Sequence, residues 1–293
     1  TGTASQRERD LPAHVVVYYT IALALYMQSS YREVLRCLLE GVQWLLDPAL
    51  ALKVTGNSGI SQARTRLGWA PLRQLHDDVV KPIAVAATKG AWYRDLRLVS
   101  IDGSTLEIAD ESANAAAFGR PGASRGESAF PQLRFVSLVE NGTHVLFGTQ
   151  QGPYATGEIT LAKTVLSALC RGMLCLADRN FFGFALWLQA CATGADLLWR
   201  IKTNARLPRE QPLADGSYLS RIYRSQKDRR HQRTGVPVRA IGERLHGVPD
   251  SEPISPAMTS PPAPAPPPAA HPAPPPPPRR DASRPPAALH RPP

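Results

Sequence analysis

The sequence of 293 residues has few cysteines and no apolar run long enough to cross a bilayer. The paired spacing of a zinc site is absent from its four cysteines, which are Cys37, Cys170, Cys175 and Cys191. We therefore expect buried, reduced thiols in a cytoplasmic protein, and neither disulfides nor zinc ligands. The apolar stretch from Leu11 to Met27 is short and contains a histidine, a threonine and three tyrosines. It predicts a buried helix and no membrane partner.

Acidic residues are outnumbered. Lysine and arginine total 34 against 24 aspartates and glutamates, which gives a net charge of +10. The excess is concentrated between Arg200 and His246, where 12 basic residues face 4 acidic ones. Such a segment suits a polyanionic partner such as nucleic acid. A solvated basic surface with no partner stays open as the alternative.

Aliphatic side chains are nearly absent from the end of the chain. Eighteen of the 41 residues from Pro253 to Pro293 are proline, and only Ile254, Met258 and Leu289 are aliphatic. This composition cannot offset the entropy lost on ordering. We therefore expect folded material to end near residue 250 and residues 251–293 to form a disordered, proline-rich tail.

Residues 1–92 have the periodicity of a helical domain. Pro12 suits the first turn of a helix that runs to about Met27, and Ser30 with Glu33 matches a capping box for a second helix. A third helix is predicted over 61–68. A fourth begins at Pro71, and Pro82 kinks or ends it.

The third of these helices carries Gln62, Arg64 and Arg66 on its predicted outer surface. Short helices joined by a Gly/Ser turn could dock in a DNA groove as a helix-turn-helix does. A plain helical bundle whose arginines face water explains the pattern equally well, so both interpretations stay open.

From Asp95 the periodicity becomes that of a mixed α/β domain over residues 93–250. Strands are predicted at 96–102, 133–139, 143–149, 173–177 and 197–202, and helices at 159–169 and 182–192. Asn141-Gly142 predicts a two-residue hairpin. Three strands then pair locally, and helical crossovers add two parallel strands. The order resembles the ribonuclease H-like core, a mixed sheet with flanking helices.

Asp102 and Asp178 each follow an apolar run predicted to be a strand. Parallel neighbouring strands end at the same edge of a sheet, so the two carboxylates should converge there. Close carboxylates repel each other unless a cation lies between them, and Mg²⁺ prefers oxygen ligands of this kind. Either aspartate alone could be a turn residue. Their matched placement favours a metal site that supports in-line phosphodiester displacement.

At this point the sequence resembles the DDE transposases of bacterial insertion sequences, in the insertion-element-four group. The resemblance covers roughly residues 10 to 245. It is carried by "LPAHVVVYYTIALALY" and "YREVLRCLLEG" in the helical region, by "IDGST" around Asp102 and by "LADRNFFG" around Asp178. It implies an enzyme that cleaves and joins DNA with Mg²⁺ or Mn²⁺. The implied partners are double-stranded DNA, as element ends and target, and a second copy of the chain on that DNA.

The resemblance also implies residue roles. Asp102 and Asp178 would be the first two metal ligands, and Arg179 would lie near the scissile phosphate or brace the site. DNA-binding roles fall to the outer residues of the third helix and to the basic segment: Gln62, Arg64, Arg66, Arg221, Arg224, Lys227, Arg229, Arg230 and Arg233.

The chain departs from the family at the third metal ligand, a glutamate within a Tyr-Arg-Glu-Lys signature. Tyr218 and Arg221 have the required spacing, but Ser225 holds the glutamate position and Gln232 the lysine position. Neither Glu243 nor Glu252 has the signature around it. No third ligand is therefore assigned.

The missing glutamate lies close to the change in composition. A frameshift near residues 240 to 255 would explain both features. The competing hypothesis is a genuine polyproline tail that docks in an aromatic groove of a partner.

Two other functions stay open. The chain could be a non-catalytic DNA-binding remnant of a transposase, because two ligands hold a metal less well than three. It could instead be an unrelated ribonuclease H-like nuclease with the same metal pair. His144 and His231 are candidate acid–base groups, but turn and basic-loop contexts predict ordinary surface histidines for both.

Overall fold

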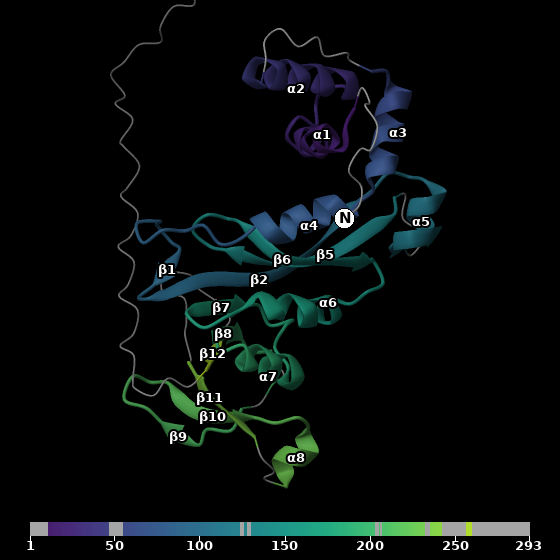
Figure 1. The fold of residues 1–293 in the computed structure, drawn as a ribbon. Helices are drawn as coiled ribbons and strands as arrows, with labels where there is room; N and C mark the ends of the chain where they lie inside the picture. Colours follow the sequence, from purple (N-terminus) through teal and green to yellow (C-terminus); the bar gives the residue numbers. More distant parts are fainter. Residues whose placement is uncertain are drawn as a thin grey trace, which may run out of the picture.

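A computed structural model describes residues 11–46, 55–123, 126–127, 130–202, 205, 207–231, 235–241 and 256–259 of the chain. Four helices come first (Figure 1): α1 Ala13–Leu25, α2 Tyr31–Leu46, α3 Asn57–Leu67 and α4 Ala70–Val79. The helices expected in this region are therefore confirmed. Within the described residues, no helix has the length and apolar character needed to cross a membrane.

Local sequence explains where these helices begin and end. The Ser30 hydroxyl accepts a hydrogen bond from the backbone N–H of Glu33 at 3.3 Å, as a capping residue does at the start of α2. Gly68 ends α3 at a φ of 68°, a conformation that favours glycine. α4 ends at Val79, before Pro82.

The first three helices share a small core that is separate from the core of the sheet. α1 contacts both α2 and α3. Val16 and Tyr19 of α1 are buried against Leu35 of α2 and Ile60 of α3. The Tyr19 hydroxyl also donates to the carbonyl oxygen of Tyr31 at 3.0 Å, which ties α1 to the start of α2.

The second core belongs to a large mixed sheet. Its first five strands in spatial order are β6 Leu146–Pro153, β5 Gln132–Glu140, β2 Leu96–Glu107, β7 Met173–Ala177 and β8 Asp196–Arg200. The first three are antiparallel to one another, whereas β7 and β8 run parallel to β2. This order confirms the expected ribonuclease H-like mixed sheet, with an N-terminal helical region before it.

Two helices cover one face of this sheet. α6 (Glu158–Val165), extended by a 3-10 turn (Leu166–Ala168), packs on β5 and β6, and α7 (Phe184–Ala192) packs on β8. The core between helices and sheet contains Trp187 and Trp199, whose rings meet edge to face with centroids 5.3 Å apart.

Several shorter elements complete the described chain. β1 (Trp92–Tyr93) pairs with β2, α5 spans Ser112–Phe118, and β3 (Gly122–Ala123) pairs with β4 (Gly126–Glu127). Beyond β8 the sheet continues through β12 (Pro256–Met258), β11 (Val236–Ala240), β10 (Tyr218–Ile222) and β9 (Gln211–Pro212). A short helix, α8 (Gln226–Arg230), connects β10 to β11.

The expected end of folded material near residue 250 is wrong. β12 lies between β8 and β11, where Ala257 faces Trp199 on one side and Ala240 on the other. A short strand of small residues fits this buried position, and Ala257 is 0% exposed. The proline count concealed this strand, because Pro256 stands at its first residue, where proline is tolerated. The remaining tail lies outside the described residues.

The predicted two-residue hairpin at Asn141-Gly142 is also wrong. β5 ends at Glu140 and β6 begins at Leu146, so the connection is five residues long. Hydrogen bonds of its own residues hold it open. Asn141 accepts from the hydroxyl of Ser100 on β2 at 2.8 Å, and the Thr143 hydroxyl donates to Glu140.

Glu140 anchors this corner of the domain. Its carboxylate is 0% exposed and accepts hydrogen bonds from the N–H groups of Ile83 and Ala84, at 3.0 and 2.9 Å, and from Arg97 and Thr143. Burial acts to raise the pKa of Glu140, but these hydrogen bonds outweigh it and leave the pKa below its ordinary value. The buried carboxylate joins the segment before β1 to the sheet.

The cysteines depart in part from the expectation of burial. All four thiols are free, and Cys175 is buried. Burial raises the pKa of Cys175 to about 12. Cys37 and Cys170 are exposed, because each lies on the solvent side of its element or at a turn.

Candidate active site

The register of β2 and β7 brings the two conspicuous aspartates together. The strands are parallel, and the last pair in their ladder is Ile101 with Ala177. Asp102 and Asp178 are the next residues on the two chains. Neighbouring strands lie about 4.8 Å apart, and equivalent positions face the same side of a sheet. The two carboxylates therefore lie side by side on one face.

The expected position of Asp102 at a strand end needs correction. β2 continues past it to Glu107, with β5 as partner on that side, and Asp102 pairs with Ser137. β7 stops at Ala177. The open edge beside Asp102 therefore results from the end of β7 and not from the end of β2.

Each carboxylate is held by one backbone hydrogen bond. The N–H of Gly103 donates to Oδ1 of Asp102, and the N–H of Asn180 donates to Oδ1 of Asp178, both at 2.8 Å. Both aspartates are exposed. Within the described part of the chain, neither Oδ2 atom has a hydrogen-bond donor or a cationic side chain as partner.

Two adjacent carboxylates with their outer oxygens open are a donor set that fits a hard divalent cation. The described residues contain no group of three or more His, Cys, Asp and Glu side chains that could hold a metal ion. Protein ligands from these residues would therefore number two, and water or phosphate oxygens would complete the shell.

A third carboxylate, unnoticed in the sequence, lies close by. Glu158 at the start of α6 lies over Gly103, and a Cβ atom built on Gly103 would be 3.0 Å from Cγ and Cδ of Glu158. Alternation along β2 directs this position to the opposite face from Asp102. Glu158 therefore flanks the strand that carries Asp102 without joining the pair. Only the glycine in "IDGST" hinted at this close approach.

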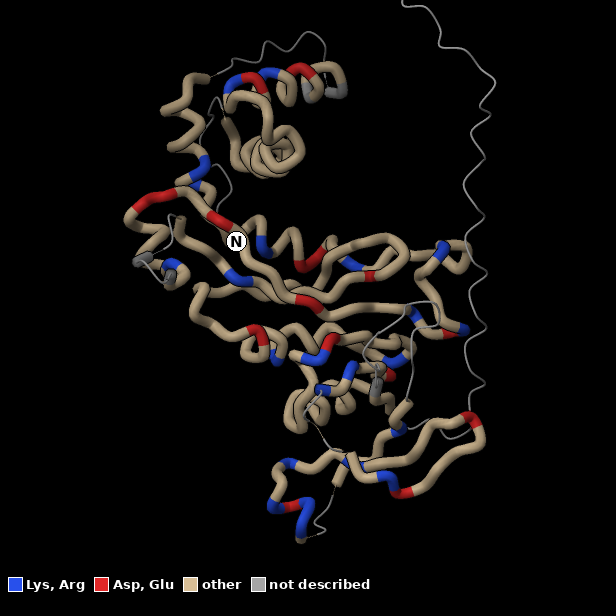
Figure 2. The backbone as a smooth tube through the Cα atoms, turned by 180° about the vertical axis from the view of Figure 1, so that it is seen from behind, with Lys and Arg blue, Asp and Glu red and all other residues tan. Residues whose placement is uncertain are grey.

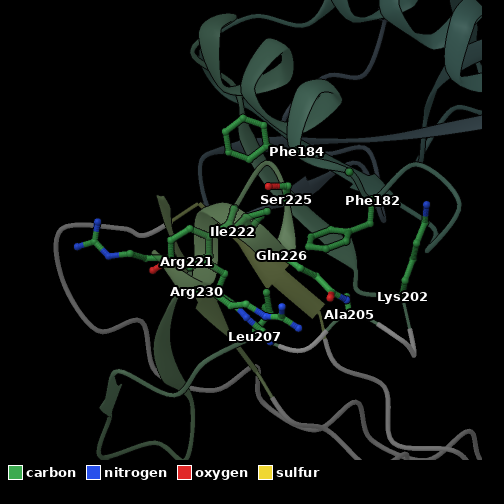
Figure 3. A pocket seen from close by; sticks show the side chains of 13 residues that line it. Phe182, Phe184, Lys202, Ala205, Leu207, Arg221, Ile222, Ser225, Gln226 and Arg230 are labelled. Atoms are coloured by element: carbon green, nitrogen blue, oxygen red, sulfur yellow. The ribbon is translucent and has the colours of Figure 1, made fainter. Parts of the chain in front are cut away.

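A pocket of about 570 Å³ opens next to the loop that follows Asp178 (Figure 3). Its walls come from the start of α7, the end of β8, β10 and α8. Phe182 and Tyr223 supply aromatic surface, while Lys202, Arg221 and Arg230 supply positive charge. A basic pocket with aromatic walls suits the phosphates and bases of nucleic acid.

Lys202 is a member of this pocket that sequence reasoning missed. It follows Ile201 just past the end of β8, as Asp178 follows the end of β7. Because β7 and β8 are parallel, their carboxyl ends lie at the same edge of the sheet. That strand-end position was the available signal.

The predicted basic residues fall into three groups. Arg224, Lys227 and Arg230 are exposed on or beside α8 (Figure 2). Arg221 forms an ion pair with Glu210 at 3.1 Å and lines the pocket, as Arg229 does. Arg233 lies outside the described residues, as do Gln232, Glu243 and Glu252.

The residues at the family's signature positions lie on a strand and a helix cap. Tyr218 and Arg221 belong to β10. Ser225 is the N-cap of α8, and its hydroxyl accepts from the N–H of Asp228 at 3.1 Å. The serine therefore has a structural role at the position where the family has its glutamate.

The remaining candidates lie at the surface. Gln62, Arg64 and Arg66 are exposed on α3, and Arg64 lies over the ring of Tyr31 at 5.8 Å. Arg179 is exposed next to Asp178. The two histidines, His144 and His231, are exposed on turns.

Comparisons with known proteins match nearly the whole described chain. Residues 1–77 match the family described as insertion element 4 transposase N-terminal, and residues 93–265 match the transposase DDE domain. The InsZ protein of Escherichia coli (strain K12) is 26% identical over 198 residues, which are 67% of this chain and 63% of InsZ. The transposase InsG for insertion sequence element IS4, from the same strain, is 24% identical over 235 residues, or 78% of this chain and 51% of InsG.

The chain thus spans between one half and two thirds of the length of these relatives. Among solved structures, the endonuclease V of Streptomyces avermitilis is 16% identical, with 64% of this chain and 76% of that chain covered. Its TM-score of 0.26 is too low to support an argument about fold or function.

Proposed function

Because this chain belongs to the DDE transposases of the insertion-element-four group, we propose that it is a metal-dependent DNA transposase that cleaves phosphodiesters at the ends of its element and joins them to target DNA. The observation that carries the proposal is the register of β2 and β7, which makes Asp102 and Asp178 neighbours. We further propose the cytoplasm as its compartment.

In this proposal Asp102 and Asp178 hold Mg²⁺ or Mn²⁺ through their outer carboxylate oxygens. The hydrogen bonds from Gly103 and Asn180 fix the inner oxygens and so orient both ligands. A bound divalent ion would supply Lewis-acid stabilisation of the negative charge that develops in a phosphodiester displacement.

The residues around the pair would handle the DNA. Arg179, next to Asp178 and exposed, would contact the phosphate at the site of cleavage. Lys202 and Arg230 in the pocket would neutralise further phosphates along the strand, and Phe182 offers an aromatic wall to a base. Gln62, Arg64 and Arg66 on α3 would contribute to recognition of the element ends.

Strand cleavage tests this proposal. Wild-type protein incubated with DNA of the element ends and Mg²⁺ or Mn²⁺ should nick the strand at the element boundary, and chelation should stop the reaction. Asp102→Asn should abolish cleavage, whereas Glu107→Gln, an exposed carboxylate change on the same strand, should leave it intact. Equal cleavage by Asp102→Asn and wild type would refute the role of the pair.

Binding of DNA is tested separately by its dependence on salt. Affinity should fall steeply as salt rises, because each phosphate contact releases counterions. Lys202→Gln or Arg230→Gln should each lower the salt slope by about 1, as expected for one lost phosphate contact. Lys89→Gln, an exposed lysine outside the pocket, is the matched control.

A second candidate function is supported by Ser225. If the serine at the glutamate position leaves the metal too weakly held for turnover, the chain acts as a non-catalytic DNA-binding protein at the element ends. This function predicts wild-type DNA affinity with no cleavage in Mg²⁺ or Mn²⁺. Cleavage that Asp102→Asn abolishes would exclude it.

A further inference from the structure

The outward face of α1 is apolar and has no partner among the described residues. α1 carries no Lys, Arg, Asp or Glu (Figure 2). One side of the helix packs on α2 and α3 through Val15, Val16 and Tyr19. A helix of a soluble domain usually has polar residues on its other side, but here Tyr18, Ile21 and Leu25 are exposed.

The exposed residues have the spacing of a helix-pairing seam. His14, Tyr18, Ile21 and Leu25 follow one another at intervals of four, three and four residues, and all four are exposed. This interval pattern places side chains in one stripe along a helix and is the pattern by which one helix packs on another. Neither a strand nor a phosphate backbone requires it.

The seam continues past the end of the helix. Tyr26 and Met27 are 59% and 80% exposed, next to Leu25 at 74%. Together with Tyr18 and Ile21 they offer apolar surface on the order of 600 Å² per copy, or about 1,200 Å² in a symmetric pair, which reaches the range of stable interfaces. Single exposed apolar residues are ordinary, but a continuous patch of this kind marks an interaction site.

We propose that α1 is a dimerisation helix and that its seam packs against the same seam of a second copy of this chain. An uncharged, aromatic stripe excludes DNA as the occupant, because phosphates require positive charge. It also matches itself, since a two-fold axis places the same patch on both sides of an interface. His14, the polar residue of the seam, lies at its end and so reaches solvent at the rim.

The geometry leaves the DNA-binding candidates accessible. α3 presents Gln62, Arg64 and Arg66 as exposed residues, and they are not part of the α1 seam. Pairing through α1 would join two copies while both sets of α3 residues stay exposed. The inference does not depend on catalysis, so it is tested without any activity measurement.

The test is the mass of the full chain in solution, by light scattering and sedimentation over a dilution series. Wild type should be a dimer with twice the monomer mass of 31.8 kDa. Ile21→Glu should weaken the dimer about a hundredfold or more, because each dimer would bury two unpaired carboxylates. Leu188→Glu on α7 is the matched control, since Leu188 is 40% exposed and Ile21 42%; it should remain a dimer.

The outcomes decide the proposal. A wild-type monomer at the highest concentration overturns it and indicates that another part of this chain covers the seam. A dimer that Ile21→Glu leaves intact also overturns it and assigns the interface elsewhere. Circular dichroism of Ile21→Glu with the wild-type helical signal, together with loss of the dimer, supports it, because the substitution then acts on association and not on folding.

Discussion

The adjacency of Asp102 and Asp178 predicts a measurable repulsion in the metal-free protein. At roughly 5 Å, two unit charges repel by ~0.8 kcal/mol in a water-like medium and ~3 kcal/mol at the effective dielectric constant of a protein surface. Both side chains are exposed, so we expect a value near the lower figure. Asp102→Asn and Asp178→Asn should each raise the free energy of unfolding by about 1 kcal/mol.

Asparagine keeps the inner oxygen that accepts from the backbone of Gly103 or Asn180, so the substitution removes charge and little else. A double-mutant cycle isolates the repulsion. The double variant should be no more stable than either single one, because removal of one charge already abolishes the repulsion. The coupling free energy should therefore be about 1 kcal/mol at low salt and should shrink in 1 M salt, where the Debye length is about 3 Å.

The assay is urea unfolding without metal, at pH 7, followed by circular dichroism. Asp102→Asn combined with Glu107→Gln is the control cycle, because these positions are five residues apart on the same strand. Its coupling should be near zero. A coupling between Asp102 and Asp178 no larger than that of the control pair would refute the adjacency of the two carboxylates.

Two further predictions concern the corner of the domain near Glu140. Glu140→Gln should lower the free energy of unfolding at pH 7 by about 3 kcal/mol or more, since it leaves the buried Arg97 contact without its anion. Because the folded pKa of Glu140 is lowered, its contribution is complete above the unfolded pKa of about 4.3 and is lost as pH falls through the folded value. Unfolding curves from pH 7 to pH 3 should therefore be flatter for Glu140→Gln than for wild type; parallel curves would contradict this role. Gly142→Ala should cost about 1–3 kcal/mol, because its Cβ would be 2.5 Å from Cβ and 2.7 Å from the backbone nitrogen of Ala91. Gly157→Ala, with nothing within 4 Å, is the control, and equal thermal midpoints of the two variants would show that the turn yields.

Hydrophobic periodicity predicted the four N-terminal helices and the five central strands because it reports which side of an element is buried. The apolar run of β7, Met173–Ala177, was predicted with the bounds that the structure has. The placement of Asp102 beside Asp178 followed from strand order alone. These features depend on local sequence and on the few topologies that connect strands through helices.

Features set by long-range contacts could not be predicted. β12 is a strand only because β8 and β11 offer it two partners, and Pro256–Met258 has no strand pattern of its own. The turn after Glu140 depends on Ser100 and on Thr143, which the hairpin dipeptide does not reveal. Lys202 joined the pocket because β10 and α8 lie opposite it.

The most direct test of the central claim is a titration of the full chain with Mn²⁺, followed by electron paramagnetic resonance of the free ion and by calorimetry. Wild type should bind Mn²⁺ at the pair, Mg²⁺ should compete for the site, and either Asp102→Asn or Asp178→Asn alone should abolish the binding. Glu107→Gln should leave it unchanged. Mn²⁺ binding that survives in both aspartate variants would contradict a shared metal at these two residues.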